Sequence, residues 1–227
     1  MKLDLKKKKL REINNTLQNF DNKKNDRDFV IINPEGSHAL CAGLNQEMKV
    51  LIKGHVGYYC AGMNQKAHVT IDGNVGTGVA ENMMSGKVHV KGNASQSAGA
   101  TAHGGLLVID GDASSRCWIS MKGVDIIVKG SVGHMSGFMS QSGNLIVCGD
   151  AGEALGDSLY ETNIYIRGKV KSLGADCIEK KMDKKHIKKL SKFLKVANIK
   201  NLKAESFKRY GSARKLYNFK VDNIGNY

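Results

Sequence analysis

The sequence predicts an all-β fold: a single-stranded right-handed parallel β-helix, or solenoid, of about seven 19-residue coils with a basic helical C-terminal tail. Three observations predict it. A 19-residue repeat runs through the middle of the chain, apolar residues alternate within each copy, and 227 residues contain 26 glycines but one proline. Repeats of this length are typical of solenoids, in which each unit buries its apolar face only by stacking on its neighbours.

The repeat has the form V-x-I-x-G-x-V-G and occurs seven times without a gap. The copies begin at Val50, Val69, Val88, Leu107, Ile126, Leu145 and Ile164. Apolar residues stand four and two positions before the glycine and two after it, which indicates a strand with one buried face. We expect the glycines to form sharp corners in left-handed conformations, which a residue without Cβ tolerates. These glycines are Gly54, Gly73, Gly92, Gly111, Gly130, Gly149 and Gly168. The segment FVIINPEG, which ends at Gly36, 18 residues before Gly54, resembles an earlier, imperfect copy.

The position before each glycine supports stacking in register. It holds Lys53, Asp72, Lys91, Asp110, Lys129, Cys148 and Arg167, so that charges alternate along the first five coils. Side chains at one repeat position form an outward column when coils stack, and alternation avoids like-charge neighbours.

One outward position is apolar in the later coils. Three residues before the glycine stand Val108, Ile127, Ile146 and Tyr165, a stripe that must be covered by the chain's own tail or by another subunit. The sequence leaves both alternatives open.

The two ends of the chain differ in composition from the centre. Residues 1–28, 29–170 and 171–227 carry net charges of +4, −1 and +11. We therefore expect a basic lead-in over 1–28 that is helical or partly disordered, the β-helix over 29–171, and a basic, helical extension over 172–227. Within that extension, apolar residues from Ile187 to Ala197 recur at helical spacing after Asp183, the expected N-cap. A neutral centre makes nucleic-acid binding a minor alternative, and adsorption of the basic helix to a membrane surface is another.

The sequence contains no recognisable catalytic constellation. The seven histidines show no metal-binding spacing, and stretches such as GNVGTG from Gly73 lack the context of a phosphate-binding loop. Asp112 and Asp150 are interpreted as corner residues rather than an acid/base pair. Three of the five cysteines, Cys41, Cys60 and Cys117, share one repeat position with Val79, Ala98 and Ser136, which indicates buried thiols. We therefore predict no catalytic, cofactor-binding or metal-binding residue in this chain.

The repeat over residues 50–171 resembles the GXGXG-domain family, the C-terminal β-helix of the glutamate synthase large subunit, which also occurs as free-standing subunits. The tail extends the resemblance through K-S-L-G-A-D-C from Lys171 and R-Y-G-S-A-R from Arg209 to Arg214. There it looks like the small subunit of N-methylglutamate synthase (methylamine-glutamate N-methyltransferase) and of related split glutamate synthases. A more distant relative with the same repeat is the C subunit of formylmethanofuran dehydrogenase.

This resemblance implies a non-catalytic scaffold subunit in a cytoplasmic, multi-subunit enzyme. The expected partners are a glutamine-amidotransferase-like subunit and an FMN-binding synthase subunit that also holds an iron-sulfur centre. The product would be N-methylglutamate or glutamate. The alternative is a stand-alone β-helix, either a binding module or a carbohydrate-active protein; the aromatic residues near candidate faces, Tyr58, Tyr59, Trp118, Phe138 and Tyr160, are scattered for a sugar platform.

Overall fold

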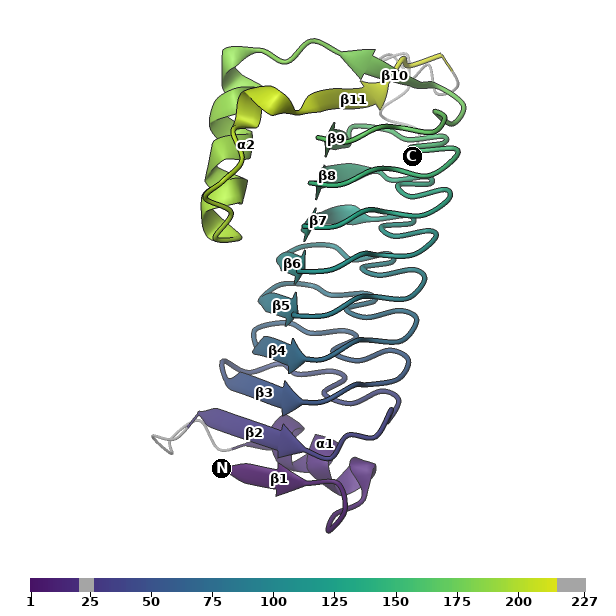
Figure 1. Ribbon diagram of the computed structural model, residues 1–227. Coiled ribbons are helices and arrows are strands. Elements are labelled where there is room, and N and C mark those ends of the chain that lie inside the picture. Colours follow the sequence, from purple (N-terminus) through teal and green to yellow (C-terminus); the bar gives the residue numbers. More distant parts are fainter. Residues whose placement is uncertain (21–26, 216–227) are drawn as a thin grey trace, which may run out of the picture.

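The computed structural model describes residues 1–20 and 27–215, and these residues form a parallel β-solenoid (Figure 1). Within this part of the chain, one sheet of eleven strands runs along the molecule. The predicted fold class is therefore confirmed, including about seven repeated coils and a C-terminal helix. The expectations for residues 21–26 of the lead-in and 216–227 of the extension lie outside the described residues.

Seven strands carry the repeat, and each pairs in parallel with the next. They are β3 (Lys49–Lys53), β4 (His68–Asp72), β5 (Lys87–Val90), β6 (Leu106–Ile109), β7 (Lys122–Val128), β8 (Ser142–Val147) and β9 (Asn163–Ile166). Val50 pairs with Val69, and Val69 with Val88, so the register equals the 19-residue period. The predicted inward positions are fully or almost fully buried along the solenoid, except for the half-buried Val170 in the last coil. They form one continuous core of stacked Val, Ile and Leu.

The first residues contain a helix, as expected for the lead-in, and also a strand that joins the sheet of the solenoid. Strand β1 (Lys2–Asp4) pairs in parallel with β2 (Asp28–Ile32). Between them, α1 (Leu10–Gln18) buries Ile13 and Leu17 against the first coils. The amide of Asn14 donates to the carbonyl of Ala39 (2.8 Å) and its oxygen accepts from the N–H of Cys41 (2.9 Å). Helix α1 thus closes the N-terminal end of the core, as the terminal coil of a solenoid requires.

The imperfect first copy is a coil, but with a different register from the one that its glycine suggests. Phe29 and Ile31 of β2 pair with Val50 and Ile52 of β3, a separation of 21 residues instead of 18. Because strand pairing follows the buried face, the inward Phe29 and Ile31 set the register.

The repeat glycines are required for a different reason from the one predicted. Only Gly54 of the seven has a left-handed φ, +123°. At the other six the obstacle is the preceding coil: a Cβ on Gly73 would lie 2.5 Å from the carbonyl oxygen of Gly54, and one on Gly111 would lie 2.9 Å from that of Gly92. The left-handed bends lie in the opposite turn of each coil, as at Tyr59, with φ 58°.

The C-terminal end of the sheet is closed by a change of strand direction. After β10 (Cys177–Lys180) come α2 (Lys184–Val196), a 3-10 turn η1 (Ala204–Ser206) and β11 (Lys208–Ser212). Strand β11 lies between β9 and β10 and is antiparallel to both. In Figure 1, α2 lies alongside the sheet, outside the solenoid.

Candidate interaction surfaces

The chemistry-bearing residues of the solenoid serve its architecture. In the described residues, no three His, Cys, Asp or Glu side chains gather to hold a metal ion. Asp112 and Asp150 lie at corners, as predicted, and each accepts a hydrogen bond from the main chain of the next coil. The donors are the N–H groups of Ser131 and Lys169, both at 2.7 Å.

These two carboxylates belong to a ladder that links seven coils. In each rung, a corner side chain accepts from the backbone N–H 19 residues later, at 2.7–3.0 Å. The ladder runs through His55, Asn74, Asn93, Asp112, Ser131, Asp150 and Lys169. Asn, Asp and Ser at this position therefore stabilise stacking, since they satisfy N–H groups that a corner would otherwise leave exposed.

The cysteines are buried and have free thiols. Cys41, Cys60 and Cys117 lie in the core, in the predicted ladder with Val79, Ala98 and Ser136. Burial raises the pKa of the Cys60 and Cys117 thiols to about 12. A thiol with such a raised pKa stays protonated near neutral pH, whereas the thiolate is the reactive form. These side chains therefore pack as small, unreactive apolar groups.

The charged column forms on the outside of the first coils. Lys91 lies 3.4 Å from Asp72, and Lys129 lies 2.7 Å from Asp110, whose carboxylate also contacts His89 at 3.0 Å. Lys53 stands beside Asp72 in register. Cys148 departs from the outward pattern, since it is buried beneath the C-terminal tail.

The apolar stripe is covered by the chain's own tail. Val108, Ile127, Ile146 and Tyr165 are each 0–2% exposed, and they pack in one cluster with Leu190 and Leu194 of α2 and with Ala197, Ala204 and Phe207. Of the two alternatives that the sequence left open, the structure shows the first. Asp183 is the N-cap of α2, as predicted, and accepts from the N–H of His186 at 3.0 Å.

A hydrogen bond joins the helix to the stripe. The Tyr165 hydroxyl and His186 Nδ1 are 2.7 Å apart. Burial raises the pKa of Tyr165 to about 12, and burial together with the nearby Arg209 lowers the pKa of His186. The neutral imidazole is thus the form that suits the docked helix.

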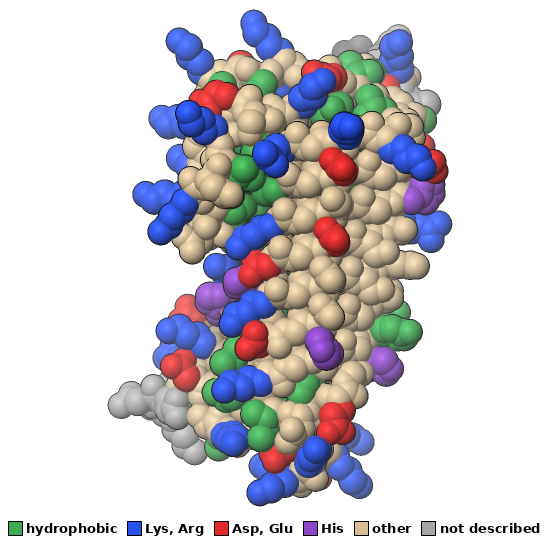
Figure 2. Space-filling model, in the orientation of Figure 1, with side chains coloured by type: hydrophobic (Ala, Val, Ile, Leu, Met, Phe, Trp, Pro, Cys, Tyr) green, Lys and Arg blue, Asp and Glu red, His purple; other side chains and the backbone are tan. Residues whose placement is uncertain are grey.

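The outer face of α2 consists almost entirely of lysines, which we call the lysine face. It comprises Lys184, Lys185, Lys188, Lys189, Lys192 and Lys195. At about 100° per residue, they fall within an arc of roughly 140°. All except the half-buried Lys189 are exposed, and none forms an ion pair with a described carboxylate. In Figure 2, blue side chains gather at this end of the molecule.

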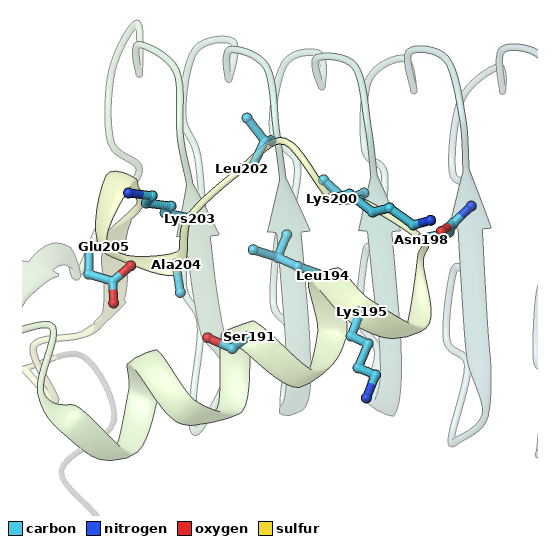
Figure 3. A pocket seen from close by; sticks show the side chains of 10 residues that line it. Ser191, Leu194, Lys195, Asn198, Lys200, Leu202, Lys203, Ala204 and Glu205 are labelled. Carbon is cyan, nitrogen blue, oxygen red and sulfur yellow. The ribbon is translucent and has the colours of Figure 1, made fainter.

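A groove of about 640 Å³ continues this surface (Figure 3). It lies between the second half of α2 and the returning segment 198–205. Leu194, Ile199, Leu202 and Ala204 supply apolar lining, and Lys195, Lys200 and Lys203 supply cationic groups, against one carboxylate, Glu205. The groove could not be predicted from the sequence, because its two walls are separated by a turn that breaks the helical periodicity.

A second exposed surface lies on the early coils. Tyr58, Tyr59 and Met63 are about half exposed, and the ring of Tyr58 stacks on His38 with centroids 4.5 Å apart. Trp118 is fully buried. It therefore cannot contribute to an aromatic platform with these tyrosines.

The fold and these surfaces define a class: a capped parallel β-solenoid whose lysine-rich tail is bound along its sheet. Protein GlxC of Rhizobium meliloti (strain 1021) is 58% identical to the chain over 225 residues, which make up 99% of each protein. The chain belongs to the family of Protein GlxC. No protein-family model and no solved structure matches it. In the described residues, no helix has the length and apolar character needed to cross a membrane.

Proposed function

We propose that this chain is the non-catalytic GXGXG-type scaffold subunit of a flavin-dependent, glutamate-synthase-like enzyme. The observation that carries the proposal is the uninterrupted solenoid of 19-residue coils, because the resemblance to GXGXG domains implies this fold. The end-to-end match to Protein GlxC is in keeping with a free-standing subunit of this length.

The exposed surfaces support a role in assembly. The inner faces of the coils are used by the core, and the apolar stripe is used by the tail. By contrast, the lysines of α2 and the exposed Tyr58 and Tyr59 do not pack against the core or the stripe within the described residues. Exposed apolar and charged patches of this kind mark interaction sites.

Within this proposal, N-methylglutamate synthase is the favoured enzyme. The tail carries the closer resemblance, and its two matching segments are part of the closure of the solenoid: Lys171–Cys177 leads into β10, and Arg209–Ser212 lies in β11. The partners are an amidotransferase-like subunit and an FMN-binding subunit with an iron-sulfur centre. The five cysteines here do not fit such a centre, since no group of ligating side chains comes together in the described residues.

The test is to purify the tagged chain from its native cells and to identify the associated chains by native mass spectrometry. We expect an amidotransferase-like chain and a flavoprotein to co-purify. Formation of N-methylglutamate from glutamate and methylamine is the expected activity of that complex. Glutamate formation from 2-oxoglutarate and an amide-nitrogen donor would instead identify a split glutamate synthase. A chain that purifies alone as a stable monomer would refute the scaffold function and favour a stand-alone binding module.

A further inference from the structure

We infer that the lysine face of α2 and the adjoining groove bind an acidic surface of a partner subunit, with an apolar partner side chain seated in the groove. This inference rests on the proposed scaffold function and assigns the docking surface for it. The charge of this segment is the first observation behind it. Residues 180–203 contain ten lysines and a single carboxylate, Asp183, whose side chain caps α2.

The exposed lysines are not needed to hold the helix in place. Helix α2 is attached by Leu190 and Leu194 and by the bond between Tyr165 and His186, all on its inner side. Lys188 and Lys192 point away from this attachment, because they lie within the exposed arc. Six cations within 13 residues repel one another, and like charges one turn apart weaken a helix. An anionic partner relieves that repulsion.

The groove favours a protein over a nucleic acid. Its accessible apolar lining, the half-buried Ile199 and Leu202, suits a hydrocarbon side chain, which a phosphate backbone does not offer. Among the described residues, this surface has no exposed aromatic ring on which bases could stack: Phe193 is half-buried and Phe207 is buried. Its cations are lysines, whereas bidentate recognition of phosphates and bases favours arginine.

Insertion into a membrane surface is disfavoured by the packing. An amphipathic helix binds lipid through its apolar face. In α2 that face is buried on the sheet, with Leu190 fully inaccessible and Leu194 4% exposed. The membrane alternative would require the helix to leave the stripe and expose Ile127 and Ile146.

The test compares two charge-reversed variants with the same change in net charge. The test variant is Lys188→Glu with Lys192→Glu, on the lysine face. The control variant is Lys7→Glu with Lys8→Glu, exposed lysines at the opposite end of the solenoid. Each is co-expressed with the amidotransferase-like and FMN-binding subunits, and complex formation is measured by native mass spectrometry. Matching circular dichroism spectra and melting temperatures show that both variants fold.

We expect assembly of the Lys188/Lys192 variant to weaken about tenfold or more, and the Lys7/Lys8 control to assemble normally. In the wild-type complex, a zero-length carbodiimide should join Lys188, Lys192 or Lys195 to partner carboxylates. If the wild type assembles and both variants assemble equally well, the docking surface is wrong and the scaffold function stands. If the wild type does not assemble, both are wrong. Tight binding of a single-stranded oligonucleotide that only the Lys188/Lys192 variant loses, with assembly intact, would identify the surface as a nucleic-acid site and overturn the inference.

Discussion

Replacing Leu190 with alanine should release α2 from the sheet while the coils stay folded. Leu190 is fully buried in the cluster that covers Ile127 and Ile146. Leucine-to-alanine changes at such sites cost about 2–5 kcal/mol, and even the lower value raises an opening equilibrium roughly thirtyfold. An isolated helix of 13 residues is marginal in water, so the released α2 should also unfold.

The assay is hydrogen exchange of the α2 amides, read by mass spectrometry on peptides from α2 and from the strands. The matched control is Ser191→Ala, which changes the exposed neighbouring residue of the same helix. We expect faster exchange in α2 only for Leu190→Ala, together with faster cleavage by trypsin at its lysines. Unchanged exchange in α2 would refute the role of Leu190. Equal acceleration in strands β3 to β5 would show that tail and solenoid unfold as one unit.

Three further predictions follow from the coils and the tail. Gly111→Ala should destabilise the protein by about 1–3 kcal/mol, because its Cβ would crowd the Asn93 side chain and the Gly92 carbonyl of the preceding coil. An unchanged melting temperature would refute this close approach. Asp110→Lys removes the carboxylate beside Lys129 and places a third cation between Lys91 and Lys129. The melting temperature should therefore fall, and the free energy of unfolding should decrease by about 1 kcal/mol. No loss would contradict the charged column. The pKa of His186 is lowered from its usual 6.5, so the docked helix binds fewer protons than the released one, and protonation favours release. Hydrogen exchange in α2, corrected for intrinsic rates, should therefore become faster as the pH falls from about 7.5 to 5.5. A tail equally protected at both values would show that His186 does not contribute to docking.

The central coils could be predicted from the sequence because their information is local and periodic. Alternation within each copy specifies the inward side chains, and the constant spacing specifies which of them meet, as Val50 and Val69 do. The N-cap at Asp183 was also readable, because capping depends on residues within one turn.

The ends were harder to predict because they depend on pairing between distant segments. The residues around Lys2–Asp4 show no local pattern that predicts a strand, because this strand is stabilised by pairing with residues 28 positions later in the chain. The antiparallel pairing of β11 with β9 depends in the same way on distant segments. The role of the repeat glycines could not be predicted for a related reason. A left-handed φ is a property of one residue, whereas the approach of Gly111 to Gly92 is a property of two stacked coils. The groove likewise arises where 198–205 returns beside α2.

The closure of the sheet bears on whether the protein can polymerise. A solenoid is a stack that could in principle continue from one molecule into the next, since edge strands expose unpaired N–H and C=O groups. Here the two edge strands of the described sheet are β1 and β10. Each carries one lysine and one carboxylate, Lys2 with Asp4 and Lys180 with Glu179, and the exposed Lys7, Lys8 and Lys181 close by in the chain make both ends basic. Two molecules that approach end to end therefore bring like charges together. This repulsion opposes growth of the sheet from one molecule into the next.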